Sequence, residues 1–282
     1  MVVWVPRPRR NYLNHVILRI LFGLIFIYVY CEYLIYYVTQ VQCGWSVLNK
    51  ESHEGIEPVY AMVIADTHLL GSRNGHWFDK WRREWQMHRA FQTAMTLHNP
   101  EVVFVLGDLF DEGKWCPEKE FNDYVDRFNR LFKVPDSTAL YSVVGNHDIG
   151  YHYRITPHLA KRFESKLKSP PVQMVSIRGN HFVLINSMAM EGDGCTLCAR
   201  TVAQISNISN ILRCSSGSSL CKGKKRLAHY SRPIIMQVST FTIKLIILIK
   251  YYTNYLKFTA RIAEFYWSLC QRCCAQYAER DP

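Results

Sequence analysis

Apolar runs alternate with mixed polar segments through the middle of the chain. Continuous apolar runs at 59–65, 102–106 and 139–144 predict strands, the first of them buried on both faces. The segments between them, around 82–97 and 118–132, are predicted to be helices. Strands separated by helices predict a βαβαβ unit with a parallel sheet, so the expected fold class is α/β.

A second set of elements is predicted after this unit. Residues 157–167 are expected to form a short helix, and 172–177 and 182–186 to form a hairpin whose turn includes His181. Beyond residue 195 the sequence shifts to Ser, Cys, Lys and Gly, and we expect little regular structure there. Residues 233–249 are again apolar, but Gln237 and Lys244 interrupt them, so a membrane role is the weaker interpretation.

The longest apolar run, residues 16–38, has the length of a transmembrane helix and carries only two charged residues, Arg19 and Glu32. Three arginines in the first ten residues favour a cytosolic N-terminus. A cleaved signal peptide is the alternative, which the length of the run disfavours. We expect a cytosolic tail (1–15), a signal anchor (16–38), a linker (39–58), a lumenal domain (59–214) and a divergent basic tail (215–282).

The net charge of +11 is unevenly distributed along the chain. Residues 200–282 hold 13 Lys and Arg against 3 Asp and Glu, whereas residues 51–199 hold 16 against 19. The middle of the chain is therefore slightly acidic, which argues against a basic nucleic-acid-binding surface there. The basic tail could contact acidic lipid or RNA, although a solvated segment is the favoured interpretation.

Ten cysteines is a high number for a chain of 282 residues. The Cys-x-x-Cys pairs at 195–198 and 270–273 have the spacing of half a zinc site, but no suitably spaced His accompanies them. If this region lies in an oxidising compartment, we expect disulfides among Cys195, Cys198, Cys214 and Cys221. Asn207-Ile208-Ser209 is an N-glycosylation sequon, which gains weight in the same compartment.

Three polar motifs directly follow the predicted strands, about 40 residues apart: Asp66-Thr67-His68, Gly107-Asp108 with Asp111 nearby, and Gly145-Asn146-His147-Asp148. Taken alone, an Asp after a strand is often a helix cap, and Gly-Asp or Gly-Asn is a common turn. Because adjacent parallel strands end at one rim of a sheet, the motifs together predict a site for two divalent cations. The predicted metal ligands are Asp66, His68, Asp108 and Asn146.

The order Asp-x-His, Gly-Asp-x-x-Asp and Gly-Asn-His-Asp resembles the calcineurin-like metallophosphoesterase superfamily, over residues 1–214. The resemblance implies the βαβαβ sandwich of that superfamily, here preceded by a transmembrane helix. It also implies that Asp66 and His68 hold one ion, that Asp108 bridges both, and that Asn146 holds the second.

The resemblance also assigns roles beyond metal binding. His147 is expected to donate to a phosphate oxygen or to the leaving group, and Asp148 to fix the orientation of His147. Two ions held by carboxylate, amide and imidazole groups suit Mn²⁺, with Zn²⁺, Fe and Mg²⁺ as alternatives.

The C-terminal part departs from the superfamily pattern. That pattern includes a later His on a strand and a Gly-His-x-His motif, but no Gly-His-x-His occurs in this chain and only His229 follows His181. The chain thus offers four of about seven expected ligands. We therefore expect a fold that is truncated or altered in its C-terminal half, with His229 as a weak substitute ligand.

Around Asp66 and Asp108 the sequence resembles a membrane-bound branch of the superfamily. That branch implies a phosphodiesterase that removes ethanolamine phosphate from the glycan of GPI-anchored proteins during export from the endoplasmic reticulum. The expected partners are GPI-anchored proteins and the membrane, not nucleic acid. The expected location runs from ER exit sites to the cis-Golgi. The alternatives are a catalytically impaired membrane protein and a phosphoesterase acting on protein phosphomonoesters or nucleic acid.

Overall fold

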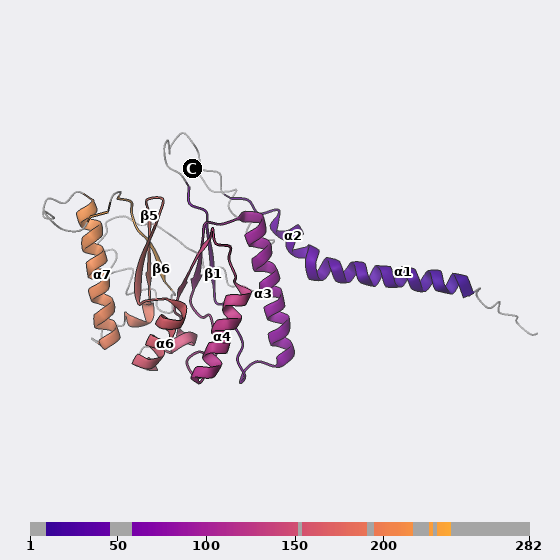
Figure 1. The fold of residues 1–282 in the computed structure, drawn as a ribbon, viewed down its shortest axis with the longest axis horizontal. Helices are drawn as coiled ribbons and strands as arrows, with labels where there is room; N and C mark the ends of the chain where they lie inside the picture. The colour runs from indigo at the N-terminus through magenta and orange to yellow at the C-terminus, as the bar shows by residue number, and fades with distance from the viewer. Residues whose placement is uncertain are drawn as a thin grey trace, which may run out of the picture.

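The computed structural model describes residues 10–45, 58–151, 154–190, 195–216, 226–227 and 230–237 (Figure 1). Its first sheet is parallel, with the strand order β1-β2-β3 and in-register pairing from Ala61 with Val102 onward. This arrangement confirms the predicted βαβαβ unit. Its members are β1 (Ala61–Ala65), α3 (Trp77–His98), β2 (Val102–Leu106), α4 (Glu118–Leu131) and β3 (Ala139–Val143).

The helix α3 begins five residues before its predicted start at residue 82. His76 has an extended backbone, and its side chain accepts a hydrogen bond from the Phe78 N–H at 3.3 Å. This contact caps the helix and satisfies one of its unpaired N–H groups. The prediction missed this start because His is not among the preferred capping residues.

The second sheet has the order β4-β5-β6, from β4 (Val172–Ile177), β5 (Asn180–Ile185) and β6 (Ile234–Gln237). β4 and β5 pair antiparallel, while β5 and β6 pair parallel. Arg178 and Gly179 form the hairpin turn with φ values of +48° and +80°, as a turn with two left-handed residues requires. His181 is buried in β5, where its Nδ1 lies 2.8 Å from Ser176 Oγ.

Four layers make up the domain, and Figure 1 shows them from left to right as α7, the second sheet, the first sheet, and the helices α3 and α4. Phe104 and Val143 of the first sheet pack against Phe182 and Leu184 of the second. Phe91 of α3 and aromatic residues of α4 cover the opposite face of the first sheet. This packing places the C-terminal ends of β1, β2 and β3 together at one rim.

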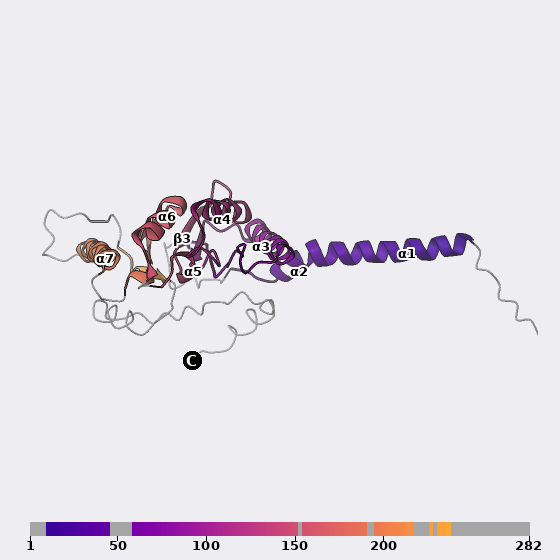
Figure 2. The ribbon, with the colours of Figure 1, turned by 90° about the horizontal axis from the view of Figure 1, so that it is seen from below.

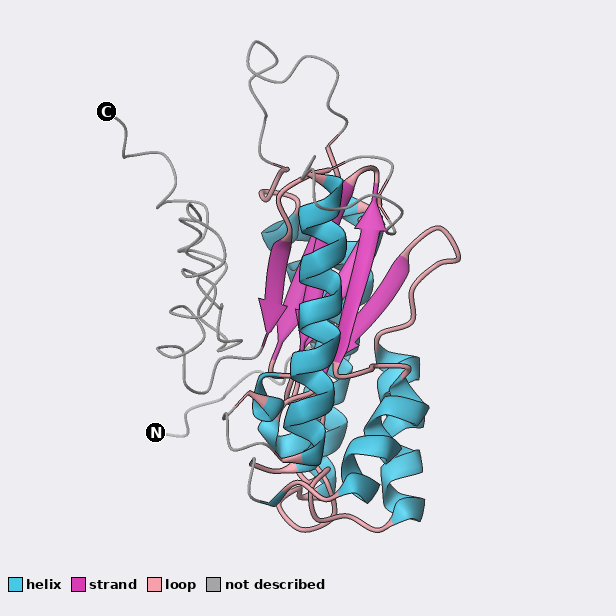
Figure 3. Ribbon diagram, turned by 90° about the vertical axis from the view of Figure 1, so that its left-hand side faces the viewer, coloured by secondary structure: helices cyan, strands magenta, loops and turns pink. Residues whose placement is uncertain are grey.

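Two findings correct the expectation of little regular structure beyond residue 195. α7 (Thr196–Ser215) is a helix of 20 residues that lies across the second sheet (Figure 3), with Ile205 and Ile208 packed against Val172, Val183 and Ile185. β6 pairs with β5 at residues that the sequence placed in the divergent tail. Residues 238–282 and His229 lie outside the described part of the chain.

The cysteine prediction is confirmed for the residues that the structure describes. Cys195 and Cys198 form a disulfide, and Cys214 is disulfide-bonded as well. Cys221 lies outside the described residues. The sequon residue Asn207 is exposed on α7.

The N-terminal helix projects from the domain beside α3 in two perpendicular views (Figures 1 and 2). It comprises α1 (Arg10–Val29), one π-helical segment η1 (Tyr30–Leu34) and α2 (Ile35–Gln40). Tyr12–Gln40, 29 residues, is long and apolar enough to cross a membrane. The remaining elements are α5 (Asn146–Ile149), α6 (Pro157–Leu167) and the 3-10 turn η4 (Ser187–Ala189).

Candidate metal centre

The turns after β1 and β2 have an unusual backbone that presents their side chains at the rim. Asp66 and His68 have φ values of +55° and +41°, and Gly107 and Asp108 follow with +65° and +47°. Positive φ is uncommon in residues other than Gly. Two backbone hydrogen bonds hold the turns together, from Asp66 N to Gly107 O at 3.2 Å and from His68 N to Asp108 O at 2.9 Å. The two motifs are thus joined directly.

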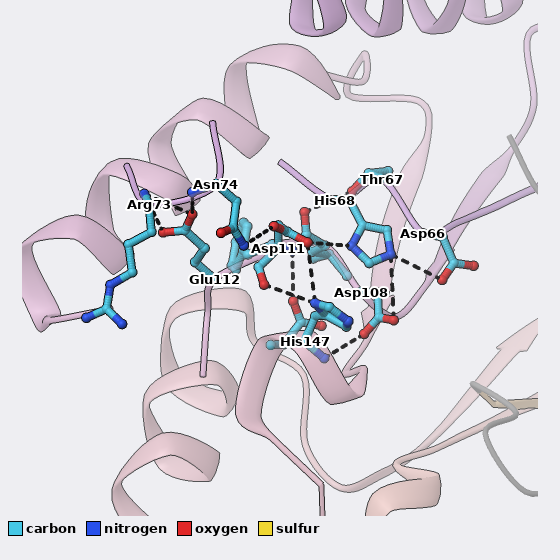
Figure 4. Close-up of polar contacts among 12 residues, drawn as sticks. Asp66, Thr67, His68, Arg73, Asn74, Asp108, Asp111, Glu112 and His147 are labelled. Atoms are coloured by element: carbon cyan, nitrogen blue, oxygen red, sulfur yellow. Dashed lines mark hydrogen bonds and ion pairs between the residues drawn. The ribbon is translucent and has the colours of Figure 1, made fainter. Parts of the chain in front are cut away.

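The imidazole of His68 belongs to two groups of possible metal ligands, one with Asp66 and Asp108 and the other with Asp111 and His147 (Figure 4). Its Nε2 is 3.8 Å from both Asp66 Oδ1 and Asp108 Oδ2. Its Nδ1 is 3.3 Å from Asp111 Oδ1, which in turn lies 3.4 Å from His147 Nδ1. Within each group the possible ligand atoms lie within 4.8 Å of one another, close enough to share one cation.

Asn146 lies beside the same cluster, between two residues that contact Asp108. A Cβ on Gly145 would stand 2.2 Å from Asp108 N and 2.3 Å from Asp108 Oδ1, so only glycine fits there. On the other side, the backbone N–H of His147 donates to Asp108 Oδ1 at 2.8 Å. Asn146 itself is buried. The third motif therefore meets the second at Asp108, as expected for strands that end at one rim.

The structure contradicts the expected role of Asp148. Its two carboxylate oxygens accept hydrogen bonds from the backbone N–H groups of Phe110 at 2.9 Å and Gly145 at 2.8 Å. Burial, together with the negative charge of Asp108, raises the pKa of Asp148 to about 8. The ring of His147 is oriented instead by Asp111, whose backbone oxygen lies 3.0 Å from Nδ1. Asp148 ties the second and third motifs together and does not orient His147.

Three residues of the centre were not predicted. Asp111 joins His68 and His147, and its other oxygen accepts from Asn74 Nδ2 at 3.1 Å. Glu112 is buried and accepts backbone N–H bonds from Arg73 at 3.0 Å and Asn74 at 2.6 Å. The repeated Asp in Gly-Asp-x-x-Asp was a usable signal for Asp111. No sequence motif identifies Asn74 or Glu112 as part of the site, because their role depends on how the loop after β1 folds back onto the residues that follow β2.

The donor set fits divalent cations. Asp66, Asp108 and Asp111 offer carboxylate oxygens and His68 offers a ring nitrogen, a mixture that suits Mn²⁺, Zn²⁺ or Fe. His147 Nδ1 is engaged by the backbone oxygen of Asp111 instead. The side chains of Asp66, His68 and His147 are 36%, 27% and 31% exposed, so the rim is open to solvent and to a ligand.

His181 lies in β5 and not in the hairpin turn where the sequence placed it, because the turn closes at Arg178 and Gly179. The turn that precedes it contacts residues at the end of the first sheet opposite the metal centre, since Arg178 Nε is 3.1 Å from a carboxylate oxygen of Glu101, the residue just before β2. Among the described residues, the two groups that share His68 are the ones whose geometry could hold a metal ion.

Comparisons with known proteins agree with this geometry. The family model for calcineurin-like phosphoesterases matches residues 60–193. Metallophosphoesterase 1 of Danio rerio is 43% identical over 223 residues, that of Mus musculus 47% over 221, and the Drosophila melanogaster homolog 45% over 210. These matches cover 77%, 76% and 74% of this chain, but only 58%, 55% and 56% of the relatives. The chain thus spans little more than half the length of these relatives.

Among solved structures, a protein of unknown function from Aquifex aeolicus is 16% identical, with 54% of this chain and 75% of that chain covered and a TM-score of 0.27. That likeness is too low to carry an argument. The matched residues 60–193 contain all three motifs and both groups of the metal centre. Residues 60–193 therefore form a calcineurin-like phosphoesterase domain.

Proposed function

We propose that this chain is a membrane-anchored phosphodiesterase that uses two divalent cations, Mn²⁺ first among them, to remove ethanolamine phosphate from the glycan of GPI-anchored proteins. The observation that carries the hydrolase part is the pair of ligand groups that share His68. The relatives named Metallophosphoesterase 1 support a phosphoesterase, and the proposed substrate is the one that the resemblance of the motifs implies.

The chemistry divides between the cations and the protein. Bound divalent cations would supply Lewis acidity, which lowers the pKa of water and offsets the charge of a phosphoryl group. Asp66, Asp108 and Asp111 would hold the cations together with His68 and Asn146. His147, whose ring is held at Nδ1 and is about one third exposed, is positioned to donate to a phosphoryl oxygen or to the leaving group.

The test of this function is release of ethanolamine phosphate from a purified GPI-anchored protein by the full-length chain in Mn²⁺. We expect release by the natural chain and a loss of at least about 100-fold in Asp108→Asn, because an amide cannot replace the negative charge that Asp108 brings to its group with Asp66 and His68. Glu118→Gln, an exposed carboxylate on α4, is the matched control and should keep full activity. Absence of turnover with metal bound would overturn the proposal.

The early secretory location and lumenal orientation are part of the proposal, and Asn207 offers a test of them. This residue is exposed on α7, so an oligosaccharyltransferase can reach it only if the domain is lumenal. We expect a mass shift that is removed by an N-glycosidase and is missing in Asn207→Gln. An unglycosylated chain in secretory membranes would contradict the orientation.

A catalytically impaired membrane protein is the second candidate. The observation that favours it is the lack of a Gly-His-x-His motif in the sequence. Metal analysis by mass spectrometry of the purified chain distinguishes the two. About two ions per chain supports the hydrolase, whereas a chain without metal supports the impaired form.

A further inference from the structure

The end of the N-terminal helix is packed against α3 rather than hanging free. Glu32 accepts hydrogen bonds from Arg82 and, at 3.0 Å, from Trp85 Nε1. The ring of Tyr33 contacts Trp85, with centroids 5.6 Å apart, and the guanidinium of Arg89 at 4.6 Å. Further along, Gln40 Nε2 donates to the Ala90 carbonyl at 3.0 Å. These contacts fix the direction in which the helix leaves the domain.

The position of Glu32 along the helix sets the depth of α3 relative to a bilayer. The apolar helix begins at Tyr12, and Glu32 follows 20 residues later, which at 1.5 Å per residue is about 30 Å, the thickness of the hydrocarbon core. A span that begins at Tyr12 thus ends near Glu32 and not at residue 38, where the sequence placed it. Glu32 and its partners on α3 therefore lie at the bilayer surface when α1 spans. Figures 1 and 2 show α3 running across the direction of α1, so α3 lies along that surface.

The first two turns of α3 expose three large aromatic side chains. Trp77, Phe78 and Trp81 are 69%, 47% and 58% exposed. Their rings contact one another, with centroids 5.8 Å apart for Trp77 and Phe78 and 5.9 Å for Phe78 and Trp81. Phe78 stands four residues before Arg82, which puts it on the same face of α3 as the contact with Glu32. Single exposed aromatic residues are common on protein surfaces, whereas a cluster of three that adjoins a membrane anchor is unusual.

We propose that Phe78 and Trp81, with Trp77 beside them, insert into the interface of the same bilayer that α1 crosses. Trp and Phe side chains are stabilised at that depth, because their rings leave water while nearby polar groups stay hydrated. The domain then has two membrane contacts, which fix the tilt of its metal-bearing rim. This inference rests on the anchor in the proposed function, not on hydrolysis.

Photocrosslinking to lipid tests the contact in the full-length chain, reconstituted in phosphatidylcholine vesicles. Single variants carry a photoreactive residue: Phe78→p-benzoylphenylalanine, Phe26→p-benzoylphenylalanine in α1, and Val202→p-benzoylphenylalanine on α7. Phe26 and Val202 are 66% and 54% exposed, and α7 forms the layer farthest from α1 (Figure 1). After illumination, lipid adducts are measured by mass spectrometry.

We expect adducts at positions 26 and 78, and at least tenfold fewer at 202. Adducts at 26 without adducts at 78 would overturn the second contact while leaving the anchor intact. No adduct at either position would overturn the anchor and this inference together. Adducts at 202 equal to those at 78 would mean nonspecific contact and would also overturn it. Since no arm measures catalysis, these results are independent of the test of hydrolase activity.

Discussion

Glu112 holds the loop that follows the first motif, although it lies outside both ligand groups. It is 1% exposed, and both of its oxygens face backbone N–H groups of Arg73 and Asn74. Asn74 in turn donates to Asp111. The loop also passes so close that a Cβ on Gly71 would meet Glu112 Oε2 at 2.2 Å. One buried carboxylate thus connects the loop to the metal centre.

We therefore expect Glu112→Gln to weaken both the fold and metal binding. The new amide NH₂ would face backbone N–H groups, which leaves buried donors unpaired at a cost of about 1–3 kcal/mol. Displacement of Asn74 from Asp111 should weaken metal binding by roughly 10-fold to 100-fold. Thermal unfolding and metal titration measure these effects, with the exposed Glu118→Gln as control. Unchanged metal affinity would show that the loop does not support the centre.

A substitution at Gly145 tests the geometry at Asp108 more directly than the substitution at Glu112. Gly145→Ala would place a methyl group 2.2 Å from Asp108 N and 2.3 Å from its Oδ1, so Asp108 must move. We expect near-complete loss of bound metal in mass analysis of the purified variant. Gly150→Ala is the control, because φ is +96° there and strain costs about 1–3 kcal/mol, while the nearest side-chain atom is 3.5 Å away. Equal metal content in both variants would contradict the proposed centre.

Some residues of the site can be identified from the sequence pattern, and others only from the folded structure. Asp66, His68 and Asp108 could be predicted, because their motifs follow strands whose place in the sheet is fixed by hydrophobic runs. The prediction that the first strand is buried on both faces was wrong, since β1 is an edge strand and Val63 is 50% exposed. The role of Asp148 could not, since sequence does not say whether a carboxylate faces a ring or a backbone N–H. The same limit applies to Glu112, whose partners lie about 40 residues away.

At the scale of elements, strands with strong hydrophobic runs were predicted correctly, whereas elements with a weak or ambiguous hydrophobic pattern were missed. β2 and β4 have their predicted bounds, because every residue in β2 and most in β4 are apolar. α7 was missed because Ser, Cys and Asn, 7 of its 20 residues, interrupt the apolar pattern, although Ile205 and Ile208 supply the apolar face. β6 was missed because four strand residues at the start of a longer apolar run cannot be separated from that run.

The contact of α7 with the second sheet can be tested with a matched pair of substitutions. Ile208→Ala removes methyl groups that pack near Val183 and Ile185, at an expected cost of about 1–3 kcal/mol. Val202→Ala, on the exposed side of the same helix, should cost less than about 0.5 kcal/mol. Thermal unfolding should show a midpoint lowered by roughly 2–4 °C per kcal/mol in the first variant only. Equal shifts would mean that α7 does not cover the sheet.

At the scale of the whole molecule, the anchor and the domain share one interface. Glu32 is the only acidic residue in the apolar helix, and it meets Arg82 and Trp85 at the surface of the domain. The π-helical segment at Tyr30–Leu34 contains Glu32 and Tyr33, the two residues of the anchor that reach α3 from this turn. We therefore expect the helix and the domain to behave as one body and not as a domain on a flexible tether.

A double-mutant cycle on Glu32 and Arg82 measures that coupling. The two side chains are 16% and 32% exposed, so the pair is partly shielded from water and should contribute more than a fully exposed ion pair, about 1 kcal/mol or more. We expect Glu32→Gln and Arg82→Gln each to lower the unfolding midpoint of the chain in lipid nanodiscs. The double variant should lose clearly less than the sum of the single losses. Metal content should be unchanged in all three variants, because neither residue touches the metal centre. Strictly additive losses would mean that the contact does not couple the anchor to the domain.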